Sequence, residues 1–522
     1  MARSAPQRMA AQVLQDEPML ARPADVLTAT PPDTALMRHY ARSRAWCDWE
    51  GFAAWQPRVL SALADAAAPA MSPFQLLSLP GISALQQRAC AAQWLQARLQ
   101  TSARERAEVG HEWAAQTAPA RLAGRPLRIG YVSSDFHLHA TALLLAETLE
   151  AHDTARFELH AFSHGADDGR GMRERLHRSF HTFHHIGALS DADAARAIHA
   201  AGIDILVDLK GYTAGSRTHV MAYRAAPVQV SYLGYPGTLG EGGACDYLIS
   251  DRFVTPAHSH AGYSEALACL PHSYQPHGRA QALLPPPRRA DVGLPDDGLV
   301  LCCFNQAWKF TPEVFGLWCD LLAQVPGSVL WLLHDARAEG PLRSEALQRG
   351  IDPRRIVWAP DLPQAAHLAR LQCADLVLDT SPYNAHTTAS DALCAGVPLI
   401  TCAGDTFASR VAGSVLLAVG LPELITHSLA DYAALALALA RSPPRLQALR
   451  AKLAGLRVGA ALFDVAAYTR DLEALYTAMW ARHRAGLPPQ AIEVAPAAAT
   501  AAGAGAGAAA AAAAGAAADR AA

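Results

Sequence analysis

The 522-residue sequence lacks the signatures of several large protein classes. Its ten cysteines form no C-x-x-C pair and no zinc-finger spacing, so we expect reduced, mostly buried thiols. The formal net charge is only −3, so no basic field points to nucleic acid. Outside an Ala/Gly-rich tail, the longest apolar run, Tyr432 to Ala440, is too short to span a bilayer. With no apolar signal segment after Met1, we predict a cytoplasmic protein without nucleic-acid or membrane partners.

Two nucleotide-binding motifs and a metal motif are also missing. No Walker-type P-loop occurs, which disfavours nucleoside triphosphate hydrolysis. No G-x-G-x-x-G follows a strand, which disfavours dinucleotide-dependent oxidoreduction. The segment from Phe180 to His185 contains three histidines, but their spacing matches no zinc pattern. We interpret it as a surface strand and predict no metal site.

What the chain does contain is a helical region followed by two α/β series. Its length of 522 residues can hold two or three domains, and hydrophobic residues make up 51% of it, so a sizeable core is possible. Strands that alternate with helices predict parallel sheets, and two such domains in tandem suggest a ligand cleft between them. We predict a disordered N-terminus (1–32), a helical region (33–124), a first α/β domain (125–280), a Pro/Arg-rich linker (281–297), a second α/β domain with closing helices (298–492) and a disordered Ala/Gly-rich tail (493–522).

The most informative segment lies in the second α/β domain. A strand-like run, 374–378, is followed by a turn and then by His386, Thr387 and Thr388 at the start of a probable helix. Unpaired backbone N–H groups at a helix start favour anions, and two hydroxyls and an imidazole add further donors. The segment alone fits a diphosphate cradle and an ordinary helix cap equally well.

Other candidate residues lie on loops and one helix. Lys309 follows a strand-like run, where a cation can meet a phosphate, although a solvated lysine is the simpler interpretation in isolation. His139 occupies the matching loop of the first domain and could act as a general base or only cap the next helix. His367 and Arg370 share a helix face and could hold a nucleobase or phosphate, or be exposed polar positions.

Placed in order, short segments between about Arg38 and about Leu487 resemble the catalytic region of the O-GlcNAc transferases, glycosyltransferase family 41. Each segment is short, but their joint occurrence in this order is specific. The segments are Ser133-Ser134-Asp135-Phe136 with His139, Gly211-Tyr212-Thr213, Leu233-Gly234-Tyr235-Pro236-Gly237-Thr238, Leu270-Pro271-His272, Phe304-Asn305-Gln306 with Lys309, Asn384-Ala385-His386-Thr387-Thr388 with Asp391, and Ala408-Ser409-Arg410-Val411-Ala412.

The resemblance implies an α/β protein of GT-B fold: two Rossmann-like domains facing a cleft, preceded by a short TPR-like helical region. It also implies inverting, metal-independent transfer of GlcNAc from UDP-GlcNAc to a Ser or Thr hydroxyl of a protein or peptide, with no cofactor. His139 matches the proposed proton acceptor and Asp391 matches the residue that holds the ribose, and Lys309 would neutralise the leaving group. The positions that match UDP contacts are Gln306, Lys309, Leu362, Gln364, His367, Arg370, His386, Thr387 and Thr388.

The chain departs from the family pattern in several places. Animal members carry a long array of tetratricopeptide repeats, whereas here the first α/β domain starts at about residue 125. Gln364 stands where the animal enzymes have Lys, and Ala385 stands where they have Gly. Related branches of the family imply other donors, GDP-fucose or UDP-glucose. The alternative from another class is a nucleotide-sugar-binding scaffold with little activity.

Overall fold

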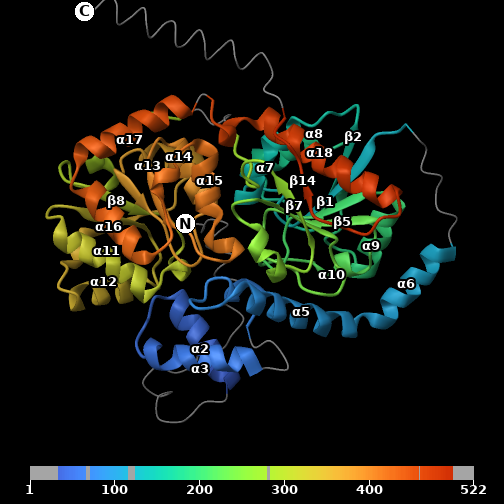
Figure 1. Ribbon diagram of the computed structural model, residues 1–522, viewed down its shortest axis with the longest axis horizontal. Helices are drawn as coiled ribbons and strands as arrows, with labels where there is room; N and C mark the ends of the chain where they lie inside the picture. The colour runs from blue at the N-terminus through green and yellow to red at the C-terminus, as the bar shows by residue number, and fades with distance from the viewer. Residues whose placement is uncertain (1–32, 66–70, 116–123, 279–282, 458, 498–522) are drawn as a thin grey trace, which may run out of the picture.

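The computed structural model describes residues 33–65, 71–115, 124–278, 283–457 and 459–497. Two parallel sheets with flanking helices lie side by side, and a group of helices crosses beneath them both (Figure 1). The predicted α/β class is therefore confirmed. No helix in the described ranges is long and apolar enough to cross a membrane. All ten cysteines are free thiols and nine are buried, as predicted.

The first sheet has eight strands, all paired in parallel, in the order β14-β7-β6-β5-β4-β1-β2-β3. Its central strands β4 and β5 are buried throughout, because helices cover both faces of a parallel sheet. Neighbouring strands end in polar residues that pair with each other, for example Asp208 of β4 with Ser231 of β5. The strands are β1 (Leu127–Ser133), β2 (Phe157–Ser163), β3 (Thr182–His185), β4 (Ile205–Asp208), β5 (Val228–Ser231), β6 (Tyr247–Asp251), β7 (Ala266–Leu270) and β14 (Ile492–Glu493).

The second sheet has six parallel strands in the order β10-β9-β8-β11-β12-β13. The central position of β8 puts the loop that follows it beside the loop that follows β11, since their carboxyl ends share one edge. These two loops carry Lys309 and the His386 segment. The strands are β8 (Val300–Cys303), β9 (Val329–Leu333), β10 (Ile356–Ala359), β11 (Leu376–Leu378), β12 (Leu399–Cys402) and β13 (Ile425–Thr426).

Helices cover both sheets, and several begin where capping residues predict. Thr311 accepts a hydrogen bond from the Val314 amide at 3.2 Å, and Pro312 takes the first helical position of α11. The helices are α7 (Ala140–Glu150), α8 (Gly171–Ser179), α9 (Asp191–Ala200), α10 (His219–Ala222), α11 (Pro312–Gln324), α12 (Glu339–Gln348), α13 (Gln364–Leu371), α14 (Thr387–Cys394), α15 (Val411–Val419), α16 (Leu429–Ala440), α17 (Pro443–Leu456) and α18 (Val465–Arg484).

The helical region bridges the two domains. Trp49 packs against Phe315 of the second domain with ring centroids 5.7 Å apart, and the Cys47 thiol donates to the Ala307 carbonyl. Leu95, by contrast, joins the hydrophobic core of the first domain. This region therefore lies across both α/β domains (Figure 1). Its helices are α2 (Asp33–Ala45), α3 (Phe52–Asp65), α4 (Pro73–Leu76), α5 (Ala84–Thr101) and α6 (Ala103–Ala115).

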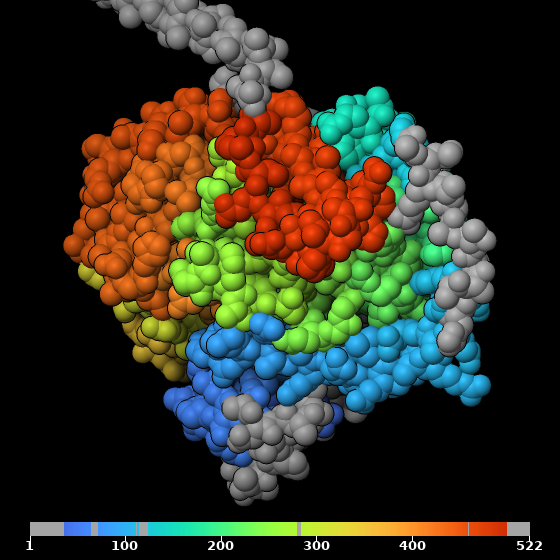
Figure 2. All heavy atoms as spheres, turned by 45° about the vertical axis from the view of Figure 1, so that its right-hand side comes forward, coloured from blue at the N-terminus to red at the C-terminus, as the bar shows by residue number. Residues whose placement is uncertain are grey.

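The predicted domain boundaries need one correction. Residues 465–493 do not belong to the second domain, because α18 packs on the first domain and β14 pairs with β7 of its sheet. Figure 2 shows this C-terminal segment lying over the first domain. The Tyr476 hydroxyl lies 3.1 Å from that of Tyr131 on β1, and Glu473 pairs with His152 at 3.0 Å.

The predicted tail also starts too early. Glu493 is part of β14, and the Ala497 amide donates to the Asp471 carboxylate of α18 at 2.7 Å. These contacts attach residues 493–497 to the first domain. The predictions for residues 1–32 and for the rest of the tail, 498–522, lie outside the described residues.

Candidate functional site

A cavity of about 1430 Å³ opens between the two domains, and the helical region forms part of its wall. Every candidate residue from the sequence lines this cavity. His139 comes from the first domain, and the others come from the second. The second-domain set is Gln306, Lys309, Leu362, Gln364, His367, Arg370, His386, Thr387, Thr388 and Asp391.

Lys309 is a buried cation rather than a solvated loop lysine. It ends the short 3-10 helix Ala307–Lys309 after β8, and only 9% of it is exposed. Its Nζ donates to the Asn384 carbonyl at 2.8 Å and lies 4.2 Å from the centre of the Tyr383 ring. Burial lowers its pKa to about 8, although the nearby Asp379 carboxylate opposes this shift. A desolvated ammonium of this kind interacts more strongly with an anion than an exposed one does.

The start of α14 is open to a ligand. His386 precedes its first turn, but the imidazole makes no capping hydrogen bond and instead lies 3.3 Å from the Ala408 carbonyl. The Thr388 hydroxyl donates to the side-chain oxygen of Asn305 at 2.7 Å, which ties this helix start to the β8 loop. The interpretation of His386 as an ordinary side-chain cap is therefore not supported. The Thr387 and Thr388 amides donate to no other described residue, whereas the Ala389 amide donates to the His386 carbonyl at 3.0 Å, so two N–H groups of the first turn are available to an anion.

Helix α13 supplies a second group of side chains to the same wall. The Arg370 guanidinium donates to Nδ1 of His367 at 3.1 Å, so the two share a helix face as predicted. Arg370 also lies 4.9 Å from the centre of the Phe304 ring. Burial lowers the pKa of His367 to about 4, so its imidazole is neutral at pH 7.

Polar side chains and one apolar side chain complete this wall. The Gln364 amide donates to the Asp391 carboxylate at 3.2 Å, and burial raises the pKa of Asp391 to about 7. Gln306 accepts a hydrogen bond from the Trp308 indole at 2.5 Å. Leu362 is 40% exposed, unusual for a leucine, and borders the cavity.

His139 faces these residues from the first domain and also caps α7. Its Nδ1 lies 3.2 Å from the Thr141 amide and 3.4 Å from Oδ2 of Asp135. The two contacts require different tautomers, because Nδ1 accepts from the amide but must donate to the carboxylate. Donation to Asp135 leaves Nε2 as a proton acceptor. Burial lowers the pKa of His139 to about 4, so the ring is neutral at pH 7.

A buried ion pair beside His139 was missed at the sequence level. Lys210 is 1% exposed, and its Nζ lies 2.9 and 2.8 Å from the two carboxylate oxygens of Asp135. Burial alone would raise the pKa of Asp135, but the charges of His139 and Lys210 outweigh it and lower that pKa. A lysine in the loop that follows a buried strand was the available signal, since Lys309 also lies in such a loop.

The described ranges contain no ready-made set of metal ligands. No group of three or more His, Cys, Asp or Glu side chains there is arranged to hold one. The histidines of residues 180–185 contribute instead to β3, the edge strand of the first sheet. The prediction of a surface strand is therefore confirmed.

Comparison with known proteins shows the family to which this chain belongs. The sequence profile of Glycosyl transferase family 41 matches residues 47–285 and 277–472. The chain belongs to glycosyltransferase family 41. It is similar to the O-GlcNAc transferase of Thermobaculum terrenum, solved as a lysine-to-methionine variant, with a TM-score of 0.71 and 27% identity. That likeness covers 86% of this chain and 85% of the other, and it confirms the GT-B fold.

Two curated family 41 proteins are among the relatives. The chain is 40% identical over 376 residues to the probable UDP-N-acetylglucosamine–peptide N-acetylglucosaminyltransferase SEC of Arabidopsis thaliana. It is 30% identical over 479 residues to the UDP-N-acetylglucosamine–peptide N-acetylglucosaminyltransferase of Caenorhabditis elegans. Each match covers 70% of this chain but only 38% and 42%, respectively, of the relative.

Proposed function

We propose that this protein is an inverting, metal-independent glycosyltransferase that moves GlcNAc from UDP-GlcNAc to Ser or Thr hydroxyls of proteins. The observation that carries the proposal is the convergence of Lys309, Arg370 and the open start of α14 on one wall of the interdomain cavity. The names of the curated relatives support the choice of donor and of a peptide acceptor. The buried free thiols support a cytoplasmic location, where cysteines stay reduced.

The leaving group sets the main electrostatic requirement of this reaction. As the bond between the sugar and the diphosphate breaks, negative charge grows on the diphosphate oxygens. Lys309 and the N–H groups at the start of α14 are the groups proposed to stabilise that charge. The Asn384 carbonyl holds Lys309, and the Asn305 side chain holds the start of α14 through Thr388. These groups therefore need little reorganisation to meet the diphosphate.

The acceptor hydroxyl is a weak nucleophile and needs a base. In the proposed mechanism, Nδ1 of His139 donates to Asp135 while Nε2 takes the proton from the hydroxyl. The oxygen then attacks the anomeric carbon from the face opposite the diphosphate, which inverts the configuration. Asp135 is in turn held by Lys210.

His139→Ala is expected to lower the rate of transfer by about 10²- to 10⁴-fold, the usual contribution of a positioned general base. Its affinity for UDP should change little, because the UDP contacts are proposed to lie on the second domain. Initial rates with UDP-GlcNAc and calorimetric titration with UDP measure the two quantities. His258→Ala, an exposed histidine outside the cavity, serves as the matched control. Wild-type transfer in His139→Ala would remove His139 from the mechanism.

The affinity for UDP is expected to fall as the pH rises above 8. Burial holds the pKa of Lys309 near 8 in the empty cavity, and a bound diphosphate would raise it. At a pH between the pKa of Lys309 in the empty cavity and its pKa with UDP bound, UDP binding takes up a proton. Each unit rise in pH there lowers the affinity for UDP by up to about tenfold. Titrations in buffers of different ionisation enthalpy would reveal this uptake. A pH-independent affinity between pH 7 and 9.5 would contradict the proposed contact.

The choice of donor can be tested separately from the chemistry. Calorimetric titrations with UDP and GDP should show tighter binding of UDP, and donor hydrolysis should be fastest with UDP-GlcNAc. Activity should survive EDTA. Tighter binding of GDP would indicate GDP-fucose as the donor. UDP binding with no turnover of any donor would favour a nucleotide-sugar-binding scaffold.

A further inference from the structure

Two arginines of the helical region border the cavity without a carboxylate partner. Arg44 belongs to α2 and Arg98 to α5. Neither makes an ion pair with any acidic side chain in the described ranges. Arg44 donates to two neutral oxygens, and Arg98 contacts the carbonyl and the ring of Trp94. Both lie on the part of the wall that the helical region adds to the two α/β domains.

Arg44 is almost completely buried. Only 4% of it is exposed, and it donates to the Ser78 hydroxyl at 3.1 Å and, more weakly, to the Trp308 carbonyl at 3.5 Å. Its Nε has no partner among the described residues. Burial lowers its pKa. A guanidinium that has lost its hydration and has no counter-ion is costly to the folded protein. An anion that enters the cavity would offset part of this cost.

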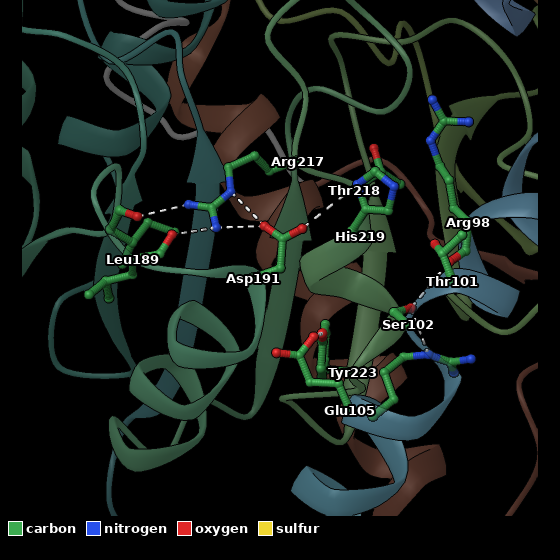
Figure 3. Close-up of polar contacts among 12 residues, drawn as sticks. Arg98, Thr101, Ser102, Glu105, Leu189, Asp191, Arg217, Thr218, His219 and Tyr223 are labelled. Carbon is green, nitrogen blue, oxygen red and sulfur yellow. Dashed lines mark hydrogen bonds and ion pairs between the residues drawn. The ribbon is translucent and has the colours of Figure 1, made fainter.

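Arg98 is half-buried and lines the same cavity. Its guanidinium lies over the Trp94 ring, 4.0 Å from the centroid. In Figure 3 its guanidinium points away from the two carboxylates drawn, those of Glu105 and Asp191, which have other partners. Glu105 accepts from the Tyr223 hydroxyl at 2.6 Å, and Asp191 accepts from Arg217 at 2.8 Å. Arg98 is therefore left to a ligand that reaches it through the cavity.

The net charge of the side chains that line the cavity also favours an anionic ligand. Seven Lys and Arg side chains line it but only three Asp, although the complete chain carries a net charge of −3. Lys210 is already paired with Asp135, and a donor diphosphate would engage Lys309. A surplus of positive charge remains on the side of the helical region. A cavity of one sign attracts ligands of the other.

We propose that Arg44 and Arg98 bind acidic side chains flanking the acceptor Ser or Thr, so that acceptor segments rich in Asp and Glu are preferred. An extended peptide advances about 3.3 Å per residue, so side chains on the two sides of the acceptor hydroxyl can contact different parts of the wall. A carboxylate can accept two hydrogen bonds from one guanidinium. The inference rests on the proposed function for the identity of the acceptor, but peptide binding can be measured without transfer.

The test compares two labelled peptides of equal length with one central Ser, one flanked by Asp and Glu and the other by Asn and Gln. Fluorescence anisotropy with UDP-saturated protein measures their affinities. The acidic peptide should bind about tenfold tighter, the size expected for a charge-assisted hydrogen bond. The difference should shrink as salt is raised. Equal affinities would overturn the inference.

The variants Arg98→Gln and Arg44→Gln should each remove most of this preference. Arg98 is the safer substitution, because Arg44 is buried and its replacement can disturb folding; circular dichroism checks both. Arg58→Gln, an exposed arginine of α3 outside the cavity, should keep the preference. Retention of the preference in Arg98→Gln and in folded Arg44→Gln would refute the assignment.

Two further outcomes separate this inference from the proposed function. Transfer to both peptides at equal rates would contradict the inference and leave the transferase proposal standing. A tenfold preference in binding with no donor turnover would support the inference and count against the transferase proposal. Binding of a single-stranded oligonucleotide through Arg98, with none of the acidic peptide, would also overturn the inference.

Discussion

Lys309→Ala is expected to lower the rate of GlcNAc transfer by about 10²- to 10³-fold, as removal of one preorganised donor to a developing anion does. The loss should fall mainly on kcat, because the charge on the diphosphate is greatest in the transition state. Lys309 suits this role because it is desolvated and held by the Asn384 carbonyl. Initial rates over a range of UDP-GlcNAc concentrations give kcat and KM separately.

Two other variants control this measurement. Lys452→Ala removes an exposed lysine of α17 that pairs with Glu423, and its kinetics should match those of the wild type. Lys309→Arg keeps the charge but changes its shape, so it should recover only part of the rate. A rate for Lys309→Ala within threefold of the wild type would show that the leaving group is stabilised elsewhere.

Lys210→Met is expected to destabilise the protein by about 3–5 kcal/mol, because it leaves the buried Asp135 carboxylate without a cationic partner. Lys210 and Asp135 are both nearly inaccessible to water and are joined by hydrogen bonds to both carboxylate oxygens. Urea unfolding followed by circular dichroism gives the change in the free energy of unfolding. Transfer should also fall, since Asp135 lies beside His139.

The double variant Asp135→Asn with Lys210→Met tests whether the loss comes from the unpaired charge. Removing both charges should recover a large part of the stability, because no buried ion remains without a partner. If the double variant is as unstable as the sum of the two single variants, the pair contributes through packing rather than charge. Lys210→Met with an unchanged free energy of unfolding would contradict the account of this ion pair.

Much of the fold was readable from local patterns. Strand β9 coincides with an unbroken apolar run, and α11 begins at Pro312 directly after the Thr311 cap; both are strong local signals. The site residues of the second domain follow the ends of its strands, where parallel sheets place ligand-binding loops. Their common position along one cavity followed from the predicted topology together with the order of the family 41 segments.

Other features depend on contacts that no local pattern reveals. The amphipathic face of α18 predicts burial but does not say which domain covers it. Strand β14 has two residues, too few for a periodicity signal. The Asp135–Lys210 pair joins residues 75 positions apart. The burial of Arg44 without a carboxylate partner depends on which residues surround it in the fold.

The cavity between the two domains is proposed to transfer GlcNAc from UDP-GlcNAc to protein hydroxyls. The most direct test of this transfer incubates the purified 522-residue chain with UDP-GlcNAc and a protein lysate in the presence of EDTA, followed by mass spectrometry of the modified peptides. The account predicts HexNAc on Ser or Thr with the wild-type protein and its loss with Lys309→Ala. Equal modification by the wild type and Lys309→Ala, or none by the wild type despite tight UDP binding, would contradict it.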